Sequence, residues 1–169
     1  MKIAALLLGL TAAAAHADDP CTGFKWNVTH ERALFALKAQ ALTAARDAGT
    51  APELATERLY DISLLPQTTV ALHVPAGAKS NFEGAFAGFA RVRISNAGRY
   101  RVALDQPGWI DLASDGGVIA STDFSGQRGC STPHKVVQFE LPAGAILLQL
   151  TGITGSHVEV TLTQAPAAP

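Results

Sequence analysis

Metal chemistry in this chain would depend on its histidines and on the carboxylates near them. The chain holds five histidines, and His73, His134 and His157 fall in segments of different pattern. An iron oxygenase site needs two histidines and one carboxylate that converge from neighbouring strands. The spacing does not favour such a set. Iron held by His73, His134 and Glu140, or by His157 and Glu159, is nevertheless an alternative that the sequence leaves open.

Calcium is the second metal alternative, because it takes about six to eight oxygen ligands. Asp111, Asp115 and Asp123 lie near glycines and could donate oxygens at one rim of a β-structure, although EF-hand spacing is absent. The run Asp115-Gly116-Gly117 is sufficiently explained as a hairpin turn. We therefore expect no cofactor and keep calcium as the alternative.

Nucleophilic catalysis is weakly supported by the residue pattern. Ser131, His134 and Asp123 share the segment 121–135, and the chain has no Gly-x-Ser-x-Gly elbow. A working triad comes from residues fixed on separate elements. The favoured interpretation is a polar loop, and the chain is more readily a binding protein than an enzyme.

Aromatic residues give the candidate ligand surfaces. An exposed Trp26 or Trp109 would suggest stacking on sugars, whereas a buried one would be an ordinary packing residue. We expect Trp109 to be buried under the N-terminal helix, beneath Leu34 and Leu37. The loops to examine first are 121–135 and the Phe-rich segment 79–89, whose phenylalanines we expect to cover one open end of the core. The candidate ligand residues are Trp26, Trp109, Phe124 and Lys135.

The cysteine count predicts a disulfide. The chain has two cysteines, Cys21 and Cys130, and in an oxidising compartment they can form only one intramolecular bridge. Closing a loop of about 110 residues would stabilise the fold by roughly 4–5 kcal/mol in the chain-entropy model.

The first residues predict an export signal. Met1-Lys2 is followed by an apolar run to Leu10, and Ala15-His16-Ala17 fits a small-x-small cleavage site. We expect cleavage after Ala17 and a periplasmic or secreted protein. The formal net charge of −1 and the lack of a basic cluster argue against a nucleic-acid partner. With no second run of membrane-spanning length, the expected partner is a protein or glycan of the cell envelope.

The elements that would position these residues are one helix and a set of strands. Apolar residues at three- and four-residue steps predict a helix over about 28–47, which Gly49 and Pro52 would end. Short alternating runs separated by Gly, Pro and Asp predict a sandwich over about 59–163. The expected strands are near 60–64, 70–74, 90–94, 100–104, 109–113, 118–121, 135–141, 146–150 and 158–162. We predict one domain over 18–163: a mainly β, jelly-roll-like antiparallel β-sandwich with the helix packed on it, and a disordered tail over 164–169.

Two resemblances add to this interpretation. The run Gly98-Arg-Tyr-Arg-Val-Ala-Leu104, followed by Trp109-Ile-Asp-Leu112 and Asp115-Gly116, resembles the bacterial pre-peptidase C-terminal domain. That family is a small, generally non-catalytic jelly-roll sandwich appended to secreted enzymes, so the resemblance implies an accessory role.

The whole chain is also similar to a group of small exported bacterial proteins that share a Cys-x-x-Phe-x-Trp start and a late Gly-Cys. Here these are Cys21, Phe24, Trp26 and Gly129-Cys130. Some members are labelled homogentisate dioxygenase, which would imply ferrous iron held by two histidines and one glutamate, but no set in this chain maps to that triad. We therefore predict a non-catalytic exported binding or accessory protein, with a metal-dependent enzyme or a carbohydrate-binding module as alternatives.

Overall fold

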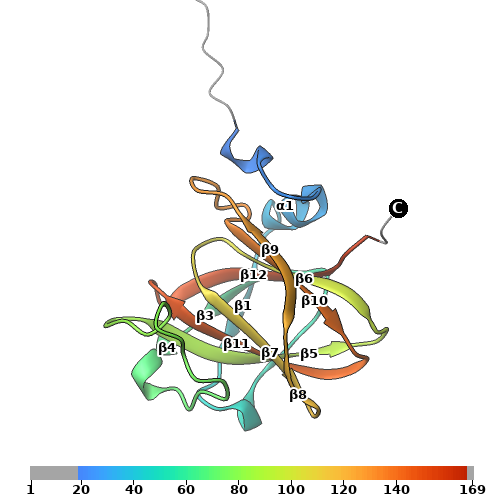
Figure 1. The fold of residues 1–169 in the computed structure, drawn as a ribbon. Coiled ribbons are helices and arrows are strands. Elements are labelled where there is room, and N and C mark those ends of the chain that lie inside the picture. The colour runs from blue at the N-terminus through green and yellow to red at the C-terminus, as the bar shows by residue number, and fades with distance from the viewer. Residues whose placement is uncertain (1–18, 167–169) are drawn as a thin grey trace, which may run out of the picture.

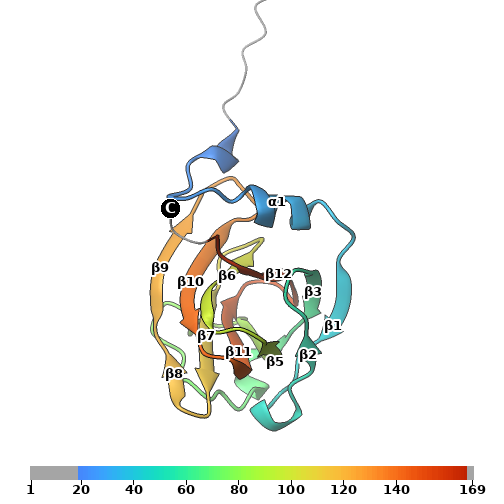
Figure 2. The ribbon, with the colours of Figure 1, turned by 90° about the vertical axis from the view of Figure 1, so that its right-hand side faces the viewer.

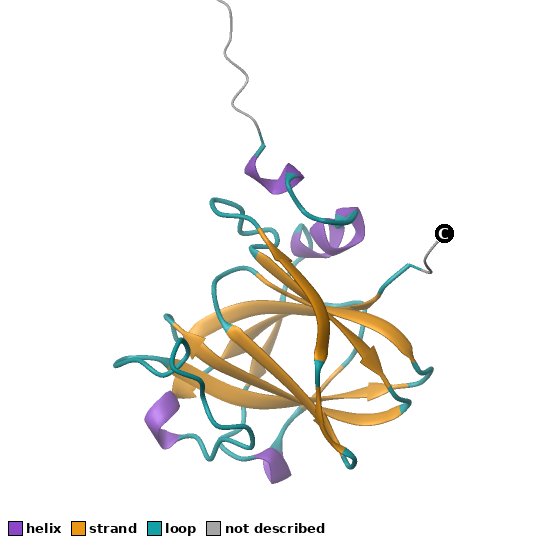
Figure 3. Cartoon of the chain, in the orientation of Figure 1, coloured by secondary structure: helices purple, strands orange, loops and turns teal. Residues whose placement is uncertain are grey.

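The chain folds into two packed β-sheets with helical segments outside them (Figures 1 and 3). The computed structural model describes residues 19–166. The strands are β1 Gln40–Thr43, β2 Glu53–Leu54, β3 Leu59–Ser63, β4 Leu65–Pro66, β5 Phe86–Ile94, β6 Gly98–Leu104, β7 Trp109–Ser114, β8 Gly117–Ile119, β9 Ser121–Gly126, β10 Lys135–Leu141, β11 Gly144–Ile153 and β12 His157–Gln164. The helical segments are α1 Thr29–Phe35 and the 3₁₀ turns Pro20–Thr22, Ala48–Thr50 and Gln67–Thr69.

The strand order is that of a jelly roll. One sheet, called sheet A, has the order β1-β3-β12-β6-β10-β9, and the other, sheet B, has the order β2-β5-β11-β7-β8, with β4 paired to β5. Most consecutive strands alternate between the sheets, so the main pairings join distant segments and are antiparallel. The short strands β1 and β2 add parallel pairs to β3 and β5. The predicted jelly-roll-like sandwich is confirmed.

The core lies between the two sheets and follows the alternation of the strands. Val102 and Leu104 of β6 face Leu148 and Leu150 of β11, and each is at most 1% exposed. Two smaller apolar clusters cover the outer faces. The cluster on sheet A contains Val28, Phe35, Leu59, Ala103 and Val136, and the one on sheet B contains Val70, Ala87 and Phe89.

The N-terminal helix is much shorter than the predicted span of 28–47. It ends at Phe35, and Gln40–Thr43 instead forms β1, which pairs in parallel with β3. Leu34, on the inner face of the helix, is buried, whereas Leu37 lies beyond the helix end and is 61% exposed. The free edge of β3 captures this segment because backbone pairing with a strand outweighs the helix propensity of its alanines. The helix packs on the outer face of sheet A, above β12 and β6 (Figures 1 and 2).

Three further expectations need correction. The alternating run 70–74 is a loop rather than a strand, and backbone N–H groups of His73 and Val74 donate to the side chain of Gln149. Part of the expected loop 121–135 is strand β9. In the expected tail 164–169, Gln164 ends β12 and the Ala165 N–H donates to the Arg99 carbonyl, while 167–169 and the leader 1–17 lie outside the described residues.

The disulfide Cys21–Cys130 is present, as the cysteine count predicted. Its sequence separation of 109 residues ties the N-terminal segment to the loop between β9 and β10. Within residues 19–166 no helix has the length and apolar character needed to cross a membrane.

Candidate functional site

A hollow of about 420 Å³ opens where the chain crosses from sheet B to sheet A. Strand β8 pairs with only Leu112–Ser114 of β7, so within residues 19–166 the first residues of β7 have no neighbouring strand on that side. After Ala120 the chain enters β9 and joins the other sheet, and β8 and β9 follow one another along one side of the sandwich (Figure 2). The hollow lies between the start of β7 and strand β9, and we call it the β7–β9 cleft.

Local sequence fixes the turn that leads from β7 into β8. Gly117 has a φ of +103°, a conformation that favours glycine, and the Gly116 N–H donates to the Ser114 hydroxyl at 3.3 Å. This Asp115-Gly116-Gly117 turn closes the β7–β8 hairpin as predicted. The hairpin then returns for only three residues before the chain changes sheets.

Two exposed aromatic rings flank the β7–β9 cleft. Trp109 is 46% exposed at the start of β7, and Phe124 is 63% exposed on β9. The floor is made of core side chains that face between the sheets, namely Ile110, Val137 and Phe139. The cleft therefore combines aromatic walls with an apolar floor, which is typical of small-molecule sites.

One cation, Lys135, and one anion, Asp111, line the cleft. The Lys135 Nζ donates to the Gly108 carbonyl at 2.7 Å and lies 5.3 Å from the centroid of the Trp109 ring. Burial lowers the pKa of the Lys135 amine, and the nearby Asp111 charge partly offsets this. Burial raises the pKa of the Asp111 carboxyl, and the Gln149 and Trp109 side chains and the Lys135 charge offset only part of this rise. Ionisable groups with shifted pKa values in a cleft are typical of functional sites.

The Gln149 side chain holds the Asp111 carboxylate in position. The Gln149 amide donates to Asp111 Oδ2 at 3.3 Å and to the Val74 carbonyl at 2.8 Å, while its oxygen accepts from two loop N–H groups. Gln149 is 1% exposed and all its polar atoms have partners. The loop after β4 thus fixes the position of Asp111 at the cleft.

A strap formed by residues 19–26 supports the Phe124 wall. Lys25 Nζ lies 2.6 Å from Asp123 Oδ1 and 5.4 Å from the centroid of the Phe124 ring. The Lys25 N–H donates to the Ser125 hydroxyl at 3.2 Å, and the disulfide at Cys21 anchors the strap. Lys25 does not line the cleft, so this cation covers the ring from outside it.

The structure brings together three of the four residues expected to form a ligand surface. Trp109, Phe124 and Lys135 all line the cleft. Trp26 is instead half-buried against the apolar cluster on the outer face of sheet A, with the Arg101 guanidinium 5.0 Å from its ring. The expected burial of Trp109 under the helix is wrong. The helix ends before Leu37 and lies on sheet A, whereas Trp109 is the first residue of β7 in sheet B. The helix therefore does not cover it.

The candidate metal ligands do not converge. Within residues 19–166 no three histidine, cysteine, aspartate or glutamate side chains lie close enough together to hold a metal ion. His134 Nδ1 lies 3.1 Å from the Cys130 carbonyl, and Asp123 pairs with Lys25. Asp115 is exposed in the hairpin turn, His73 is exposed in the loop 70–74, and Asp111 binds Gln149.

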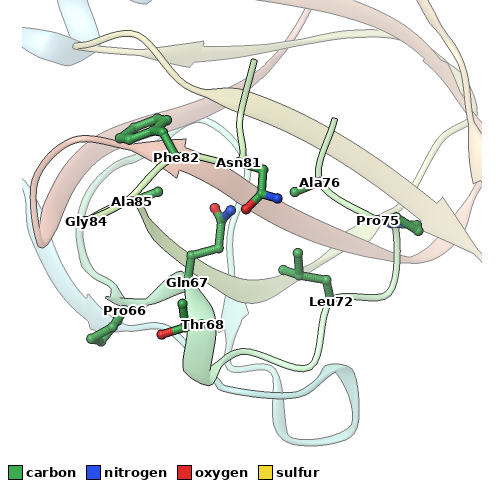
Figure 4. Close-up of a pocket in the computed structure, with 10 residues that line it drawn as sticks. All are labelled: Pro66, Gln67, Thr68, Leu72, Pro75, Ala76, Asn81, Phe82, Gly84 and Ala85. Atoms are coloured by element: carbon green, nitrogen blue, oxygen red, sulfur yellow. The ribbon is translucent and has the colours of Figure 1, made fainter. Parts of the chain in front are cut away.

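A second hollow, of about 360 Å³, lies against the Phe-rich segment (Figure 4). Gln67 is central to it, and its amide donates to the Ser80 carbonyl at 2.8 Å while its oxygen accepts from the Gly152 N–H at 2.8 Å. Phe82 on its rim is exposed, whereas Phe89 is fully buried. Both polar ends of the Gln67 side chain are bonded to the backbone, and the residues that line this hollow include no ionisable side chain, whereas the cleft has Lys135 and Asp111.

A buried ion pair was missed in the sequence. Glu31 of α1 is 1% exposed and lies 3.3 Å from Arg101 Nη1 of β6, which also donates to the Asn27 carbonyl at 3.0 Å. The signal was its spacing, since Glu31 shares the buried helix face with Leu34 and Phe35 at three- and four-residue steps. The Thr163 hydroxyl also donates to Glu31, at 3.2 Å.

A group of carboxylates on the outer surface of sheet A was also missed. Asp61 and Glu159 are directly opposite on β3 and β12, and Asp105 accepts from the Glu159 N–H at 3.1 Å. Burial, followed by the charges of Asp105 and Asp61, raises the pKa of Glu159. We call Asp61, Asp105 and Glu159 the acidic group.

The comparisons with known proteins leave the family open. No family model matches the chain, and no curated protein matches it. Among solved structures, the chain is similar to a novel β-glucosidase from Paenibacillus barengoltzii, with 15% sequence identity and a TM-score of 0.28. That match covers 73% of this chain and 13% of the β-glucosidase chain. Both resemblances noted in the sequence stay predictions.

Proposed function

We propose that this chain is an exported, non-catalytic binding protein whose ligand is a carbohydrate held in the β7–β9 cleft. The observation that carries the proposal is the pairing of exposed Trp109 and Phe124 across a hollow that also holds Lys135 and Asp111. A sugar ring has one face of C–H groups, which packs on the electron-rich face of an aromatic ring. Its hydroxyls need donors and acceptors, and the rim supplies both.

The charged groups of the cleft support binding more than catalysis. Lys135 is tied to the Gly108 carbonyl and Asp111 to Gln149, so both side chains are positioned by the scaffold. Held donors and acceptors bind a ligand with little loss of side-chain entropy. The disulfide and the expected leader support export to an oxidising compartment.

The test is binding of the mature protein to a panel of soluble polysaccharides by affinity electrophoresis and isothermal titration calorimetry. We expect at least one polysaccharide to bind, and Trp109→Ala to weaken that binding about tenfold or more, the loss of roughly 1.4 kcal/mol of stacking. Phe82→Ala is the matched control, because Phe82 is an exposed aromatic residue outside the cleft. Full binding by Trp109→Ala, or no binding by the wild type, would refute the proposal.

Export is tested separately by fractionation. The full-length chain should appear in the periplasm or medium with an N-terminus near Asp18, and the thiols of Cys21 and Cys130 should resist alkylation until a reductant is added. A full-length protein that stays in the cytoplasm with free thiols would contradict export.

A further inference from the structure

The charges around the β7–β9 cleft balance. Lys135 and Asp111 are the two ionisable residues that line it, and they carry opposite charges. On the outer side of the Phe124 wall, Lys25 is paired with Asp123 at 2.6 Å. A charged ligand would be attracted by one of these two residues and repelled by the other, by Asp111 for an anion and by Lys135 for a cation, so the cleft as a whole favours neither sign of charge.

A neutral polyol, by contrast, can use both members of the pair. The Lys135 ammonium donates, and the Asp111 carboxylate accepts. Two neighbouring hydroxyls of one sugar ring would therefore satisfy the pair without adding charge. Because Lys135 already lies over one part of the Trp109 ring, the sugar would take the ring surface that is still exposed.

The floor of the cleft adds a second requirement. Ile110, Val137 and Phe139 come from the core and, like the half-buried Ile119 above them, offer no hydrogen bonds from their side chains. A hydroxyl pressed against this floor would lose its water without gaining a partner, whereas a methyl group would gain from burial.

Resting on the proposed carbohydrate function, we infer that the preferred ligand is a neutral sugar that carries a methyl group, with two hydroxyls shared between Lys135 and Asp111 and the methyl group on the apolar floor. Acetamido sugars and 6-deoxy sugars both have this chemistry.

The experiment compares six monosaccharide probes by saturation-transfer NMR and calorimetry on the mature, disulfide-bonded protein. The neutral probes with a methyl group are N-acetylglucosamine, fucose and rhamnose, and glucose lacks the methyl group. Glucosamine adds a positive charge and glucuronic acid a negative one. We expect the methyl-bearing neutral sugars to bind most tightly and their methyl protons to receive the strongest saturation; whether the acetamido or the deoxy form wins identifies the source.

Two variants then test the charge argument by changing the preference rather than removing binding. Asp111→Asn keeps the shape but leaves Lys135 unbalanced, so glucuronic acid should gain on glucose by roughly two- to fivefold. Lys135→Met leaves Asp111 unbalanced, so glucosamine should gain on glucose by a similar factor. Because each variant is expected to improve one ligand, loss of folding cannot mimic the result.

The results distinguish failure of the preference for a methyl-bearing neutral sugar from failure of carbohydrate binding itself. Trp109-dependent binding that favours glucuronic acid, glucosamine or plain glucose in the wild type would overturn the inference and leave carbohydrate binding intact. Unchanged preferences in both charge variants would also overturn it. Absence of binding to every sugar and polysaccharide would refute both.

Discussion

Breaking the buried ion pair between Glu31 and Arg101 should be among the most damaging single changes in the described fold. Arg101→Met removes the only cation within reach of a carboxylate that is 1% exposed, in the part of the chain that the structure describes. One oxygen of that carboxylate, Oε2, is already buried without a partner there. The remaining one would keep only the Thr163 hydroxyl, at 3.2 Å.

The expected loss of stability follows from these contacts. Removing one partner of a buried ion pair costs about 3–5 kcal/mol, because an uncompensated charge is left behind. Arg101→Met also takes the donor from the Asn27 carbonyl, which adds to the cost. Against a total stability of about 5–15 kcal/mol this is a large fraction. The melting temperature should fall by roughly 10 °C or more.

A double-mutant cycle by urea unfolding separates the charge effect from lost packing. The variants are Arg101→Met, Glu31→Met and the pair together, all with the disulfide intact. Because two apolar side chains leave no buried charge, the double variant should be more stable than Arg101→Met alone. A cost below about 1 kcal/mol for Arg101→Met, or strictly additive single effects, would refute the reasoning.

Three further predictions concern the disulfide, the acidic group and the end of the helix. Reducing the bridge between Cys21 and Cys130 should lower the free energy of unfolding by roughly 4–5 kcal/mol, measured by urea unfolding with and without reductant; an unchanged midpoint would contradict it. Because the pKa of Glu159 is raised in the fold, its ionisation opposes folding as the pH rises above the ordinary value of 4.5. Glu159→Gln should therefore be more stable than wild type at pH 7, by less than about 1 kcal/mol, and this gain should vanish at low pH; equal gains at both pH values would exclude the charge explanation. Leu34→Ala should cost about 2–5 kcal/mol while Leu37→Ala stays within about 0.5 kcal/mol of wild type in thermal unfolding, and similar costs at both positions would mean that the helix continues past Phe35.

The amino-acid sequence by itself determined the features that depend on short-range patterns. The alternation of apolar residues from Tyr100 to Leu104 and from Val158 to Leu162 is enough to predict strands with one apolar face toward the core, because side chains in a strand point to opposite sides in turn. That the outer faces of both strands are also largely buried does not follow from this alternation. The turn at Asp115-Gly116-Gly117 is likewise local, since Gly117 adopts a positive φ. The disulfide needed only the count, because two cysteines allow one pairing.

Only the tertiary structure decided the features that depend on distant partners. Gln40–Thr43 has helix-forming alanine but becomes a strand, because β3 offers it an unpaired edge. The cleft unites Trp109, Phe124 and Lys135 from three strands in two sheets, and its existence depends on β8 ending after three residues. No local pattern fixes where one strand stops along its neighbour, since that is set by backbone pairing between segments that meet only in the folded chain.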